Sequence, residues 1–238
     1  SMRARILESE RELWALAPAW SRLCARARRP GVALTPAWVA AWWAEFGRPD
    51  GRRLHAIVVE SAPGELEGLA LFSTRWVRHR GIVPLRRLES VLTGEPEADE
   101  VCSEYVGPLA PAGAEVEVAR LLARALADGA HAFDELLMVR APGDDPGITE
   151  LARALGGRGF EVELSEQGSC PFAELPSSWD AYLRGLKKSH RYAVRLSQPA
   201  VVSAKEGADI EFSGKVKSLD PQTRSGVVLV GAKAGGKK

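Results

Sequence analysis

The first 186 residues of this 238-residue chain contain no lysine, and the whole chain has only three cysteines. Cys24, Cys102 and Cys170 lie far apart and form no CxxC pair, so the sequence predicts neither a zinc ribbon nor a redox dithiol. No apolar run approaches the roughly 18 residues that cross a membrane, and no apolar core follows the first charges, as a signal peptide requires. We therefore expect a soluble protein of the reducing cytoplasm without a membrane partner.

An excess of charge of one sign is also missing. The chain has 32 basic and 31 acidic residues, and 45% of its residues are hydrophobic. These proportions are typical of a globular protein with a sizeable core and exclude a disordered or fibrous chain. A net charge of +1 gives no general attraction for nucleic acid. The basic residues at 184–195 are not spread over a broader surface either, so nucleic-acid binding is not expected.

The composition changes near the end of the chain. All eight lysines lie at or after Lys187, and all seven tryptophans lie at or before Trp179. The sequence predicts three parts: a body over residues 1–170, a capped basic helix with its linker over 171–197, and a β-rich tail over 198–238. The change fits a domain boundary, a fusion or a frameshifted end, and the sequence alone does not separate these.

Hydrophobic spacing predicts an alternation of helices and strands. The helices are expected at residues 10–29, 36–46, 114–127, 148–155 and 177–196, and the strands at 54–60, 66–77, 101–106, 135–139 and 160–164. The second helix follows Thr35 and Pro36, an N-cap hydroxyl and a proline for the first helical position, and Gly47 suits its end. The first two strands should pair antiparallel through a turn at 61–65. This order of elements predicts an α/β fold with a mixed β-sheet flanked by helices.

A cluster of basic residues lies in the last expected helix, which Ser177 should cap. On a helix, Lys187, Arg191 and Arg195 recur at every fourth position and form one positively charged stripe. Arginine offers paired donors and lysine a mobile point charge, so the stripe suits a phosphate, pyrophosphate or carboxylate. The alternative is a solvated helix face without a ligand. His190, which titrates near neutral pH, is either an acid or base or an ordinary surface histidine.

Two glycine motifs match anion-binding loops in form but not in context. Residues 28–33 fit the R-x-x-G-x-A pattern by which acetyltransferases bind the pyrophosphate of acetyl-CoA, but they end an expected helix instead of opening one. Residues 231–237 have P-loop spacing, but Lys238 stands where serine or threonine is required. The four histidines show no metal-ligand spacing, so no metal site is predicted.

Several landmarks occur together in an order that is typical of one family. They are Trp14 and Trp20 in the first helix, TPAWVAAWWAEFG at residues 35–47, GLALF at 68–72, the segment 151–160, and CPFAELPSSWDAYL at 170–183 followed by LKKSHR at 186–191. In this order and spacing the chain resembles the N-terminal part of the FemAB-like acyltransferases of the GNAT superfamily, a group that includes the CelD-like proteins. The resemblance covers about residues 9–196, and the tail after Leu196 departs from it.

The resemblance implies a bacterial protein with a GNAT-like mixed sheet that transfers an acyl group from a CoA-type donor, such as acetyl-CoA, to an amine acceptor. It implies that the basic segment binds the donor or another substrate, through Lys187, Lys188, His190, Arg191 and Arg195. No catalytic residue is identified from it. The alternative is a non-catalytic binding or assembly module derived from such an enzyme.

The tail should form strands between residues 200 and 231, with a turn at 220–224 that contains Pro221. These strands either extend the sheet of the body or form an interface. In the second case, they would join copies of the chain into a homo-oligomer.

Overall fold

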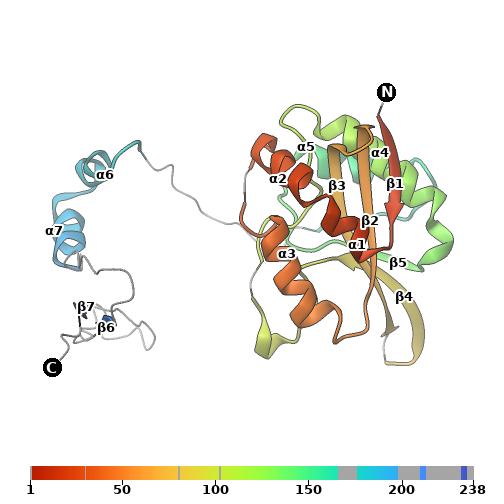
Figure 1. Cartoon of the computed structure of the whole chain (residues 1–238), viewed down its shortest axis with the longest axis horizontal. Coiled ribbons are helices and arrows are strands. Elements are labelled where there is room, and N and C mark those ends of the chain that lie inside the picture. The colour runs from red at the N-terminus through yellow and green to blue at the C-terminus, as the bar shows by residue number, and fades with distance from the viewer. Residues whose placement is uncertain are drawn as a thin grey trace. The chain divides into compact units, whose positions relative to one another are not determined.

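The computed structural model describes residues 2–29, 31–79, 81–101, 103–165, 176–197, 210–212 and 232–234. Contacts divide the chain into two compact units, Ser1–Gly168 and Ser169–Lys238 (Figure 1). The predicted division into three parts, with boundaries at residues 170 and 197, stays a prediction.

The described residues of the first unit form a sheet and a set of helices. The strands are β1 (Arg3–Leu7), β2 (Arg53–Ala62), β3 (Glu65–His79), β4 (Val83–Ser90) and β5 (Glu135–Leu137). The α-helices are α1 (Glu10–Ala15), α2 (Ala17–Arg26), α3 (Pro36–Trp42), α4 (Glu115–Asp128) and α5 (Pro146–Gly156). The π-helical turn η1 (Trp43–Gly47) continues α3, and the 3-10 turns η2 (Glu97–Asp99) and η3 (Ala130–Ala132) lie on connections.

The strands lie in the order β1-β2-β3-β4-β5 (Figure 1). β1 to β4 pair antiparallel, and the β2–β3 hairpin turns at Gly64, whose φ of 78° suits glycine. β5 pairs parallel with β4, with Arg87 opposite Glu135. A parallel pair needs a crossover, which α4 provides. The sheet is therefore mixed and flanked by helices, and this confirms the predicted α/β fold class.

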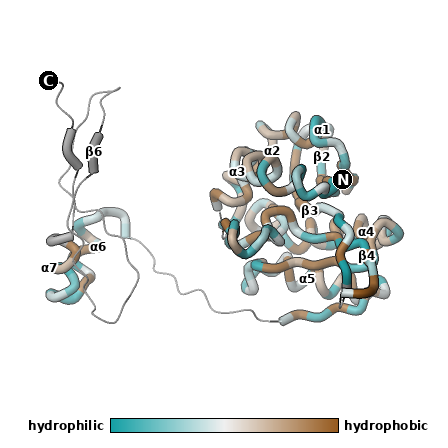
Figure 2. Tube along the Cα trace, turned by 90° about the horizontal axis from the view of Figure 1, so that it is seen from below, coloured by the Kyte–Doolittle hydropathy of each residue, from teal (hydrophilic) through white to brown (hydrophobic). Residues whose placement is uncertain are grey.

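Helices cover both faces of the sheet. Alternate residues of β2 face opposite sides: Leu54, Ala56 and Val58 belong to the core under α1, α2 and α3, whereas Ile57 and Val59 belong to the core under α4 and α5. Figure 2 shows these two groups of helices on opposite sides of the strands. Because both faces of β2 are buried, its sequence is a nearly continuous apolar run.

The helix predicted at residues 36–46 is confirmed, with a small difference at each end. Pro36 occupies the first turn of α3 and Thr35 has the extended backbone of an N-cap residue, but the Thr35 side chain accepts no hydrogen bond from the helix. At the other end, the chain continues as η1 up to Gly47. A Cβ atom on Gly47 would lie 2.4 Å from the Trp43 ring, so this position needs a glycine for close packing.

The helices predicted at residues 114–127 and 148–155 are confirmed as α4 and α5, and the predicted hairpin is confirmed as β2 and β3. Asp145 caps α5 by accepting a hydrogen bond from the amide of Gly147 (2.7 Å). The expected helix at residues 10–29 is instead two helices, α1 and α2. Pro18 has no N–H to continue the helical hydrogen bonds, so the chain breaks beside Leu16.

The strand predictions are partly wrong. Residues 101–106 form no strand among those that are described, and Tyr105 has a left-handed backbone with φ of 55° that a strand excludes. The described residues 160–164 form no strand either, although Phe160 stacks on Phe133 in the core. The strand expected at 135–139 ends at Leu137. Sequence reasoning missed β1 and β4, in which arginines interrupt the apolar pattern.

The second unit contains α6 (Trp179–Gly185), α7 (Lys188–Ser197), β6 (Ile210–Phe212) and β7 (Ala232–Ala234). The single helix expected at residues 177–196 is thus two helices. Ser178, and not Ser177 as predicted, caps α6 by accepting a hydrogen bond from the amide of Ala181 (3.2 Å). β6 and β7 pair antiparallel. The predicted turn at 220–224 and most of the predicted tail strands lie outside the described residues.

Candidate functional site

The basic segment singled out in the sequence lies at the junction of α6 and α7. The amide of Arg191 donates to the carbonyl of Lys187 (2.9 Å), and α7 begins at Lys188. Lys187 therefore precedes the helix. The stripe of Lys187, Arg191 and Arg195 starts at a bend in the chain and does not run along the middle of one continuous helix.

The guanidinium of Arg191 turns back toward α6. Its Nη2 atom donates to the carbonyls of Arg184 (3.2 Å) and Leu186 (3.0 Å) at the end of that helix. The last carbonyls of a helix have no partner within it, so Arg191 stabilises the end of α6 and the bend. Its Nε atom is buried without a hydrogen-bond partner among the described residues. Arg191 thus has a structural role that competes with binding a ligand.

The other predicted binding residues are differently placed. The side chains of Lys187, Lys188 and His190 are exposed and contact no carboxylate in the part of the chain that the structure describes. Arg195 belongs to α7, and its side chain lies outside the described residues. The proposed binding of an anion by these residues stays a prediction.

A pocket of about 500 Å³ lies in the first unit. Its walls come from the α2–α3 connection at residues 27–34, the β4–α4 connection at 101–110 and the β5–α5 connection at 142–145, with Trp38 of α3 and Glu115 of α4. Small-molecule sites commonly have volumes of roughly 300–1,000 Å³. This pocket is the candidate functional site, and none of the predicted binding residues lines it.

The position of the pocket follows from the parallel pair of β4 and β5. Connections that leave the carboxyl ends of both strands, after Ser90 and Leu137, supply its walls. The β4–α4 connection also crosses to β3, where Leu109 and Leu69 exchange hydrogen bonds of 2.7 and 3.0 Å. The carboxyl ends of such strands are where open α/β sheets commonly bind ligands, because neighbouring connections diverge there.

The walls of the pocket include strained backbone. Among the described residues, three that are not glycine have a left-handed backbone: Leu92 (φ 74°), Tyr105 (φ 55°) and Arg140 (φ 58°). All three lie on the connections that follow β4 and β5. Such a conformation costs about 1–3 kcal/mol and is kept where the surroundings hold it, most often at binding and catalytic sites. The carbonyl of Arg140 accepts a hydrogen bond from the amide of Val106 (3.0 Å), which ties the two connections together.

Two ion pairs link the α2–α3 connection to carboxylates beside the pocket. The Nε atom of Arg28 lies 3.2 Å from Oε1 of Glu115. Arg29 pairs with Asp144, and its guanidinium lies 5.6 Å from the centre of the Tyr105 ring. The hydrogen bond from Arg29 lowers the pKa of Asp144 below its ordinary value. Both arginine side chains remain about half exposed, at 51% and 44%, so a ligand can reach them.

Glu115 is the most enclosed charged side chain of the pocket. The residue is 7% exposed, and its Oε2 atom accepts a hydrogen bond from the amide of Gly113 (2.7 Å). It lies in the first turn of α4, where the helix dipole favours a negative charge. Glu104 and Asp145 also line the pocket. Two arginines and three carboxylates thus surround it, and the carboxylates do not leave it strongly positive.

The rest of the wall is mainly apolar. The indole N–H of Trp38 donates to Oγ of Ser103 (3.2 Å), which joins α3 to the β4–α4 connection. The indole N–H of Trp20 donates to the carbonyl of Leu34 (2.8 Å) and fixes the end of the α2–α3 connection. The apolar lining includes Val32, Ala33, Leu34, Val101, Pro108, Leu109 and Ala110. This lining suits a ligand with an apolar body and a charged group.

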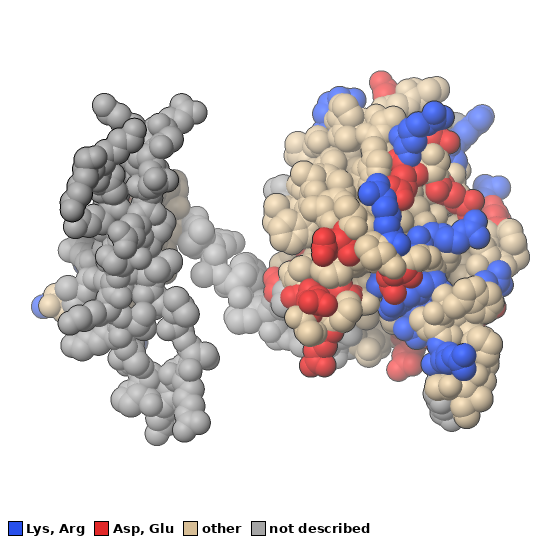
Figure 3. All heavy atoms as spheres, turned by 60° about the horizontal axis from the view of Figure 1, so that its bottom comes forward, with Lys and Arg blue, Asp and Glu red and all other residues tan. Residues whose placement is uncertain are grey.

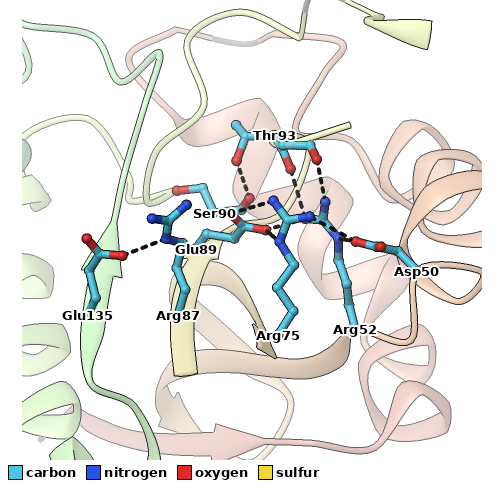
Figure 4. A network of polar contacts seen from close by, with 9 residues as sticks. Asp50, Arg52, Arg75, Arg87, Glu89, Ser90, Thr93 and Glu135 are labelled. Carbon is cyan, nitrogen blue, oxygen red and sulfur yellow. Dashed lines mark hydrogen bonds and ion pairs between the residues drawn. The ribbon is translucent and has the colours of Figure 1, made fainter. Parts of the chain in front are cut away.

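A buried ionic network holds the start of the β4–α4 connection (Figure 4). Glu89 of β4, whose side chain is 2% exposed, accepts a hydrogen bond from Nη1 of Arg52 (2.7 Å) and pairs with Nε of Arg75 (2.6 Å). Arg52 also donates to the carbonyls of Thr93 (2.9 Å) and Gly94 (2.8 Å). These bonds hold the turn after β4 from the inside.

The charges of this network balance. Asp50 pairs with both Arg52 (2.9 Å) and Arg75 (3.1 Å), so two carboxylates face two guanidiniums. The ring of Trp42 covers the Arg52 guanidinium at 5.1 Å. Buried charges are tolerated when each is paired and hydrogen-bonded. The network is therefore structural, and it positions the connection that forms one wall of the pocket.

Within the described ranges, no group of three or more His, Cys, Asp or Glu side chains is arranged to hold a metal ion. Of the helices in these ranges, none combines the length and the hydropathy needed to cross a membrane. The chain was compared with protein-family models, with curated proteins and with solved structures, and none of them matches it. The resemblance seen in the sequence therefore rests on its landmarks alone.

Sequence reasoning did not find the pocket. Two sequence features mark parts of it: the R-x-x-G-x-A motif at residues 28–33, which follows an expected helix, and Trp38, whose aromatic cluster at helical spacing is more typical of a core. The structure confirms that the motif follows α2, yet Arg28, Arg29 and Gly31 line the pocket. Three connections that are far apart in the sequence build this site, so no local spacing marks it.

Proposed function

We propose that this chain is an acyltransferase that moves an acyl group from a CoA-type donor to an amine acceptor, and that the two substrates meet in the pocket beside β4 and β5. One observation carries the proposal: a single parallel pair, β4 and β5, ends an otherwise antiparallel sheet, and a pocket of about 500 Å³ lies at its carboxyl ends. The family resemblance supports the same activity independently.

The lining of the pocket supports a donor with an apolar arm and a charged end. Trp38, Val32 and Leu109 offer apolar contact for an acyl chain and the arm that carries it. Arg28 and Arg29 are accessible, and arginine binds phosphate oxygens through paired hydrogen bonds. The start of α4 adds positive potential on the same side. A donor of this kind would exchange the carboxylate partners of the two arginines for its own phosphates.

The chemistry requires a group that accepts a proton. The nitrogen of a neutral amine attacks the thioester carbonyl, an N–C bond forms, and the C–S bond breaks. The proton that the nitrogen loses ends on the departing thiolate. Glu115, the enclosed carboxylate of the pocket wall, lies 3.2 Å from Arg28, at the end of the pocket that the proposal gives to the phosphates. A base must lie within hydrogen-bond reach of the reacting amine, so Glu115 is not assigned this role.

The basic segment of the second unit keeps a separate place in the proposal. Lys187, Lys188, His190 and Arg195 are its candidates for binding an anion, independently of the pocket in the first unit. Arg191 contributes by holding the bend between α6 and α7.

A non-catalytic binding module is the second candidate, and one observation favours it. Arg28 and Arg29 are already paired with Glu115 and Asp144. A phosphate must therefore displace a carboxylate, which weakens binding of an anionic donor. A module of this kind would hold a small ligand in the pocket without transforming it.

Calorimetric titration of the full chain with CoA and acetyl-CoA tests the proposal, with inorganic phosphate as the control. We expect saturable binding of both that phosphate does not reproduce. Release of free CoA thiol from acetyl-CoA, followed with a thiol reagent across a panel of primary amines, then separates the candidates. Amine-dependent release supports the transferase, binding without release supports the module, and absence of binding contradicts a CoA-type donor.

A further inference from the structure

β3 and β4 continue beyond the rest of the sheet as a two-stranded arm. β2 pairs with β3 only as far as Thr74, and β5 pairs with β4 only from Arg87 onward. Between them, residues 76–79 of β3 pair only with residues 83–86 of β4. Figure 1 shows this hairpin reaching past the other strands, at the lower right. A two-stranded ribbon is marginally stable in water by itself, so an arm of this kind gains from a partner.

The arm carries positive charge and exposed apolar side chains together. Residues 75–88, here called the arginine arm, contain five arginines and one histidine but no carboxylate. Three of the arginines, Arg75, Arg86 and Arg87, pair with carboxylates outside the arm. Trp76, Ile82 and Val83 are 68%, 78% and 56% exposed. Arg78 is exposed and contacts no carboxylate among the described residues. Exposed aromatic and aliphatic side chains beside arginine are typical of interaction surfaces.

The same end of the first unit also carries an acidic surface. Residues 95–104, here called the acidic segment, contain five carboxylates and no lysine or arginine. Glu97, Asp99 and Glu104 are exposed and form no ion pair within the described structure. Val101 lies among them and is 39% exposed. In Figure 3, the lower left of the first unit carries carboxylates without lysine or arginine, whereas the side next to the projecting hairpin carries arginines with carboxylates among them.

We propose that the arginine arm binds the acidic segment of a second copy of this chain in a symmetric dimer. In the described residues no ion pair joins the two surfaces within one chain, although both lie on one face. A two-fold axis between them places each surface opposite its complement, so one dimer has two equivalent contacts. In each contact, Arg78 faces Glu97 and Asp99, and Trp76, which lies on the same face of the ribbon as Arg78, covers Val101.

Charge complementarity favours a second copy over a polyanion. A nucleic acid or an anionic lipid surface that reached the arginine arm would also bring phosphates toward the five carboxylates on the same face. A second copy satisfies both surfaces at once. Val101 and Glu104 of the acidic segment also line the pocket. The dimer proposal rests on the charge and exposure of the two surfaces, and not on the proposed function.

Sedimentation velocity of the full chain over a range of concentrations tests the dimer, at low and at high salt. We expect a dimer that weakens as salt rises, because salt screens the exposed pairs. Arg78→Glu sets like charges opposite each other and should raise the dissociation constant about tenfold or more. Arg22→Glu changes the net charge equally at an exposed position of α2 and should leave the dimer intact.

Mixing two variants gives the sharpest test. Glu97→Arg with Asp99→Arg should weaken the dimer by itself, as Arg78→Glu does. Mixed together, the two proteins should form a heterodimer, because each arm then faces a segment of opposite charge.

A monomer at all concentrations overturns the proposal. A dimer that ignores both charge changes also overturns it and assigns association to another surface, such as the C-terminal strands. If the unchanged chain is monomeric but binds nucleic acid or anionic lipid vesicles, and Arg78→Glu loses that binding, the proposal is overturned in favour of a polyanion.

Discussion

Two groups of arginine–carboxylate pairs in the first unit differ in exposure more than in chemistry. Arg52 and Glu89 are almost fully buried, at 1% and 2% of their side-chain surface, and they hold the turn after β4. Arg28 and Arg29 at the pocket remain about half exposed and pair with carboxylates that a ligand can replace. The same side chains are therefore fixed structure in one place and available for binding in the other.

The difference also explains how the two regions depend on each other. The buried network fixes the beginning of the β4–α4 connection, and residues 101–110 further along this connection form one wall of the pocket. Exposed ion pairs contribute little to stability, because water and salt screen them. Removing one partner of a buried pair leaves an uncompensated charge and costs much more.

The largest effect should come from Glu89→Gln. The change leaves Arg52 and Arg75 without their shared buried carboxylate, and we expect the free energy of unfolding to fall by about 3–5 kcal/mol. Urea denaturation followed by circular dichroism measures it. Glu135→Gln is a matched control: its partner Arg87 lies at the same 2.6 Å as Arg75 does from Glu89, but the Glu135 side chain is 38% exposed. It should cost less than about 1 kcal/mol. Equal losses of free energy of unfolding in the two variants would contradict the distinction between buried and exposed ion pairs.

A change in the turn itself should have the next largest effect. Gly94 has φ of 79°, and a Cβ atom there would lie 2.8 Å from Nη2 of Arg75. Gly94→Ala should therefore lower the free energy of unfolding by about 1–3 kcal/mol. Gly81→Ala, with φ of 73° in open space at the tip of the arm, isolates the backbone cost. If both variants lose the same free energy of unfolding, the close approach of Gly94 to Arg75 does not contribute to the stability of the turn.

Arg191 is intermediate in exposure between these two groups of arginines. Its substitution distinguishes a helix-capping role from a ligand-binding role. Arg191→Lys keeps the charge but cannot reach both carbonyls of α6 with one planar group. We expect a loss of helical signal with a stability cost of about 0.5–1.5 kcal/mol for the lost hydrogen bonds. Lys188→Ala, at an exposed position, should change neither. An unchanged helical signal in Arg191→Lys would return Arg191 to the candidates for anion binding.

The smallest effect should be that of pH on the pairs that join α4 to α5. Hydrogen bonds from Arg153 and then Arg120 lower the pKa of Glu150 from 4.5 to about 2. Because the pKa in the folded chain is the lower one, the stability that these pairs add is present above pH 4.5 and is lost as the pH falls toward 2. A carboxyl titration of Glu150 by NMR, compared with Arg120→Gln, measures the midpoint. A midpoint near 4.5 in the unchanged chain would show that the pairs do not hold in water.

The parts of the fold that were predictable are those with local signals. α3 follows Pro36, α4 and α5 follow a helical stripe of buried residues, and the β2–β3 hairpin follows a turn at Gly64. β1 and β4 were missed because their arginines lie on strands with one exposed face or edge, which breaks the apolar pattern. The recurrence of apolar side chains at residues 101–106 is typical of a strand, but Val101 and Tyr105 line a pocket and Val106 packs in the core.

The candidate site was much less predictable. The prediction of a stripe through Lys187, Arg191 and Arg195 depended on one continuous helix. The spacing of residues does not reveal a bend such as the one before Lys188. The pocket depends on where the chain crosses over between β4 and β5. A single sequence carries little information about such long-range packing, so three connections that meet in space remain unrelated in the sequence.

The most direct test of the account is calorimetric titration of acetyl-CoA into two variants of the full chain. Val32→Trp places a large ring at an exposed position of the pocket wall, and Lys187→Ala with Lys188→Ala removes two charges of the basic segment. If the pocket holds the donor, the first variant loses most of the binding seen in the unchanged chain, whereas the second retains most of it. The reverse pattern, or no binding by the unchanged chain, would contradict the account.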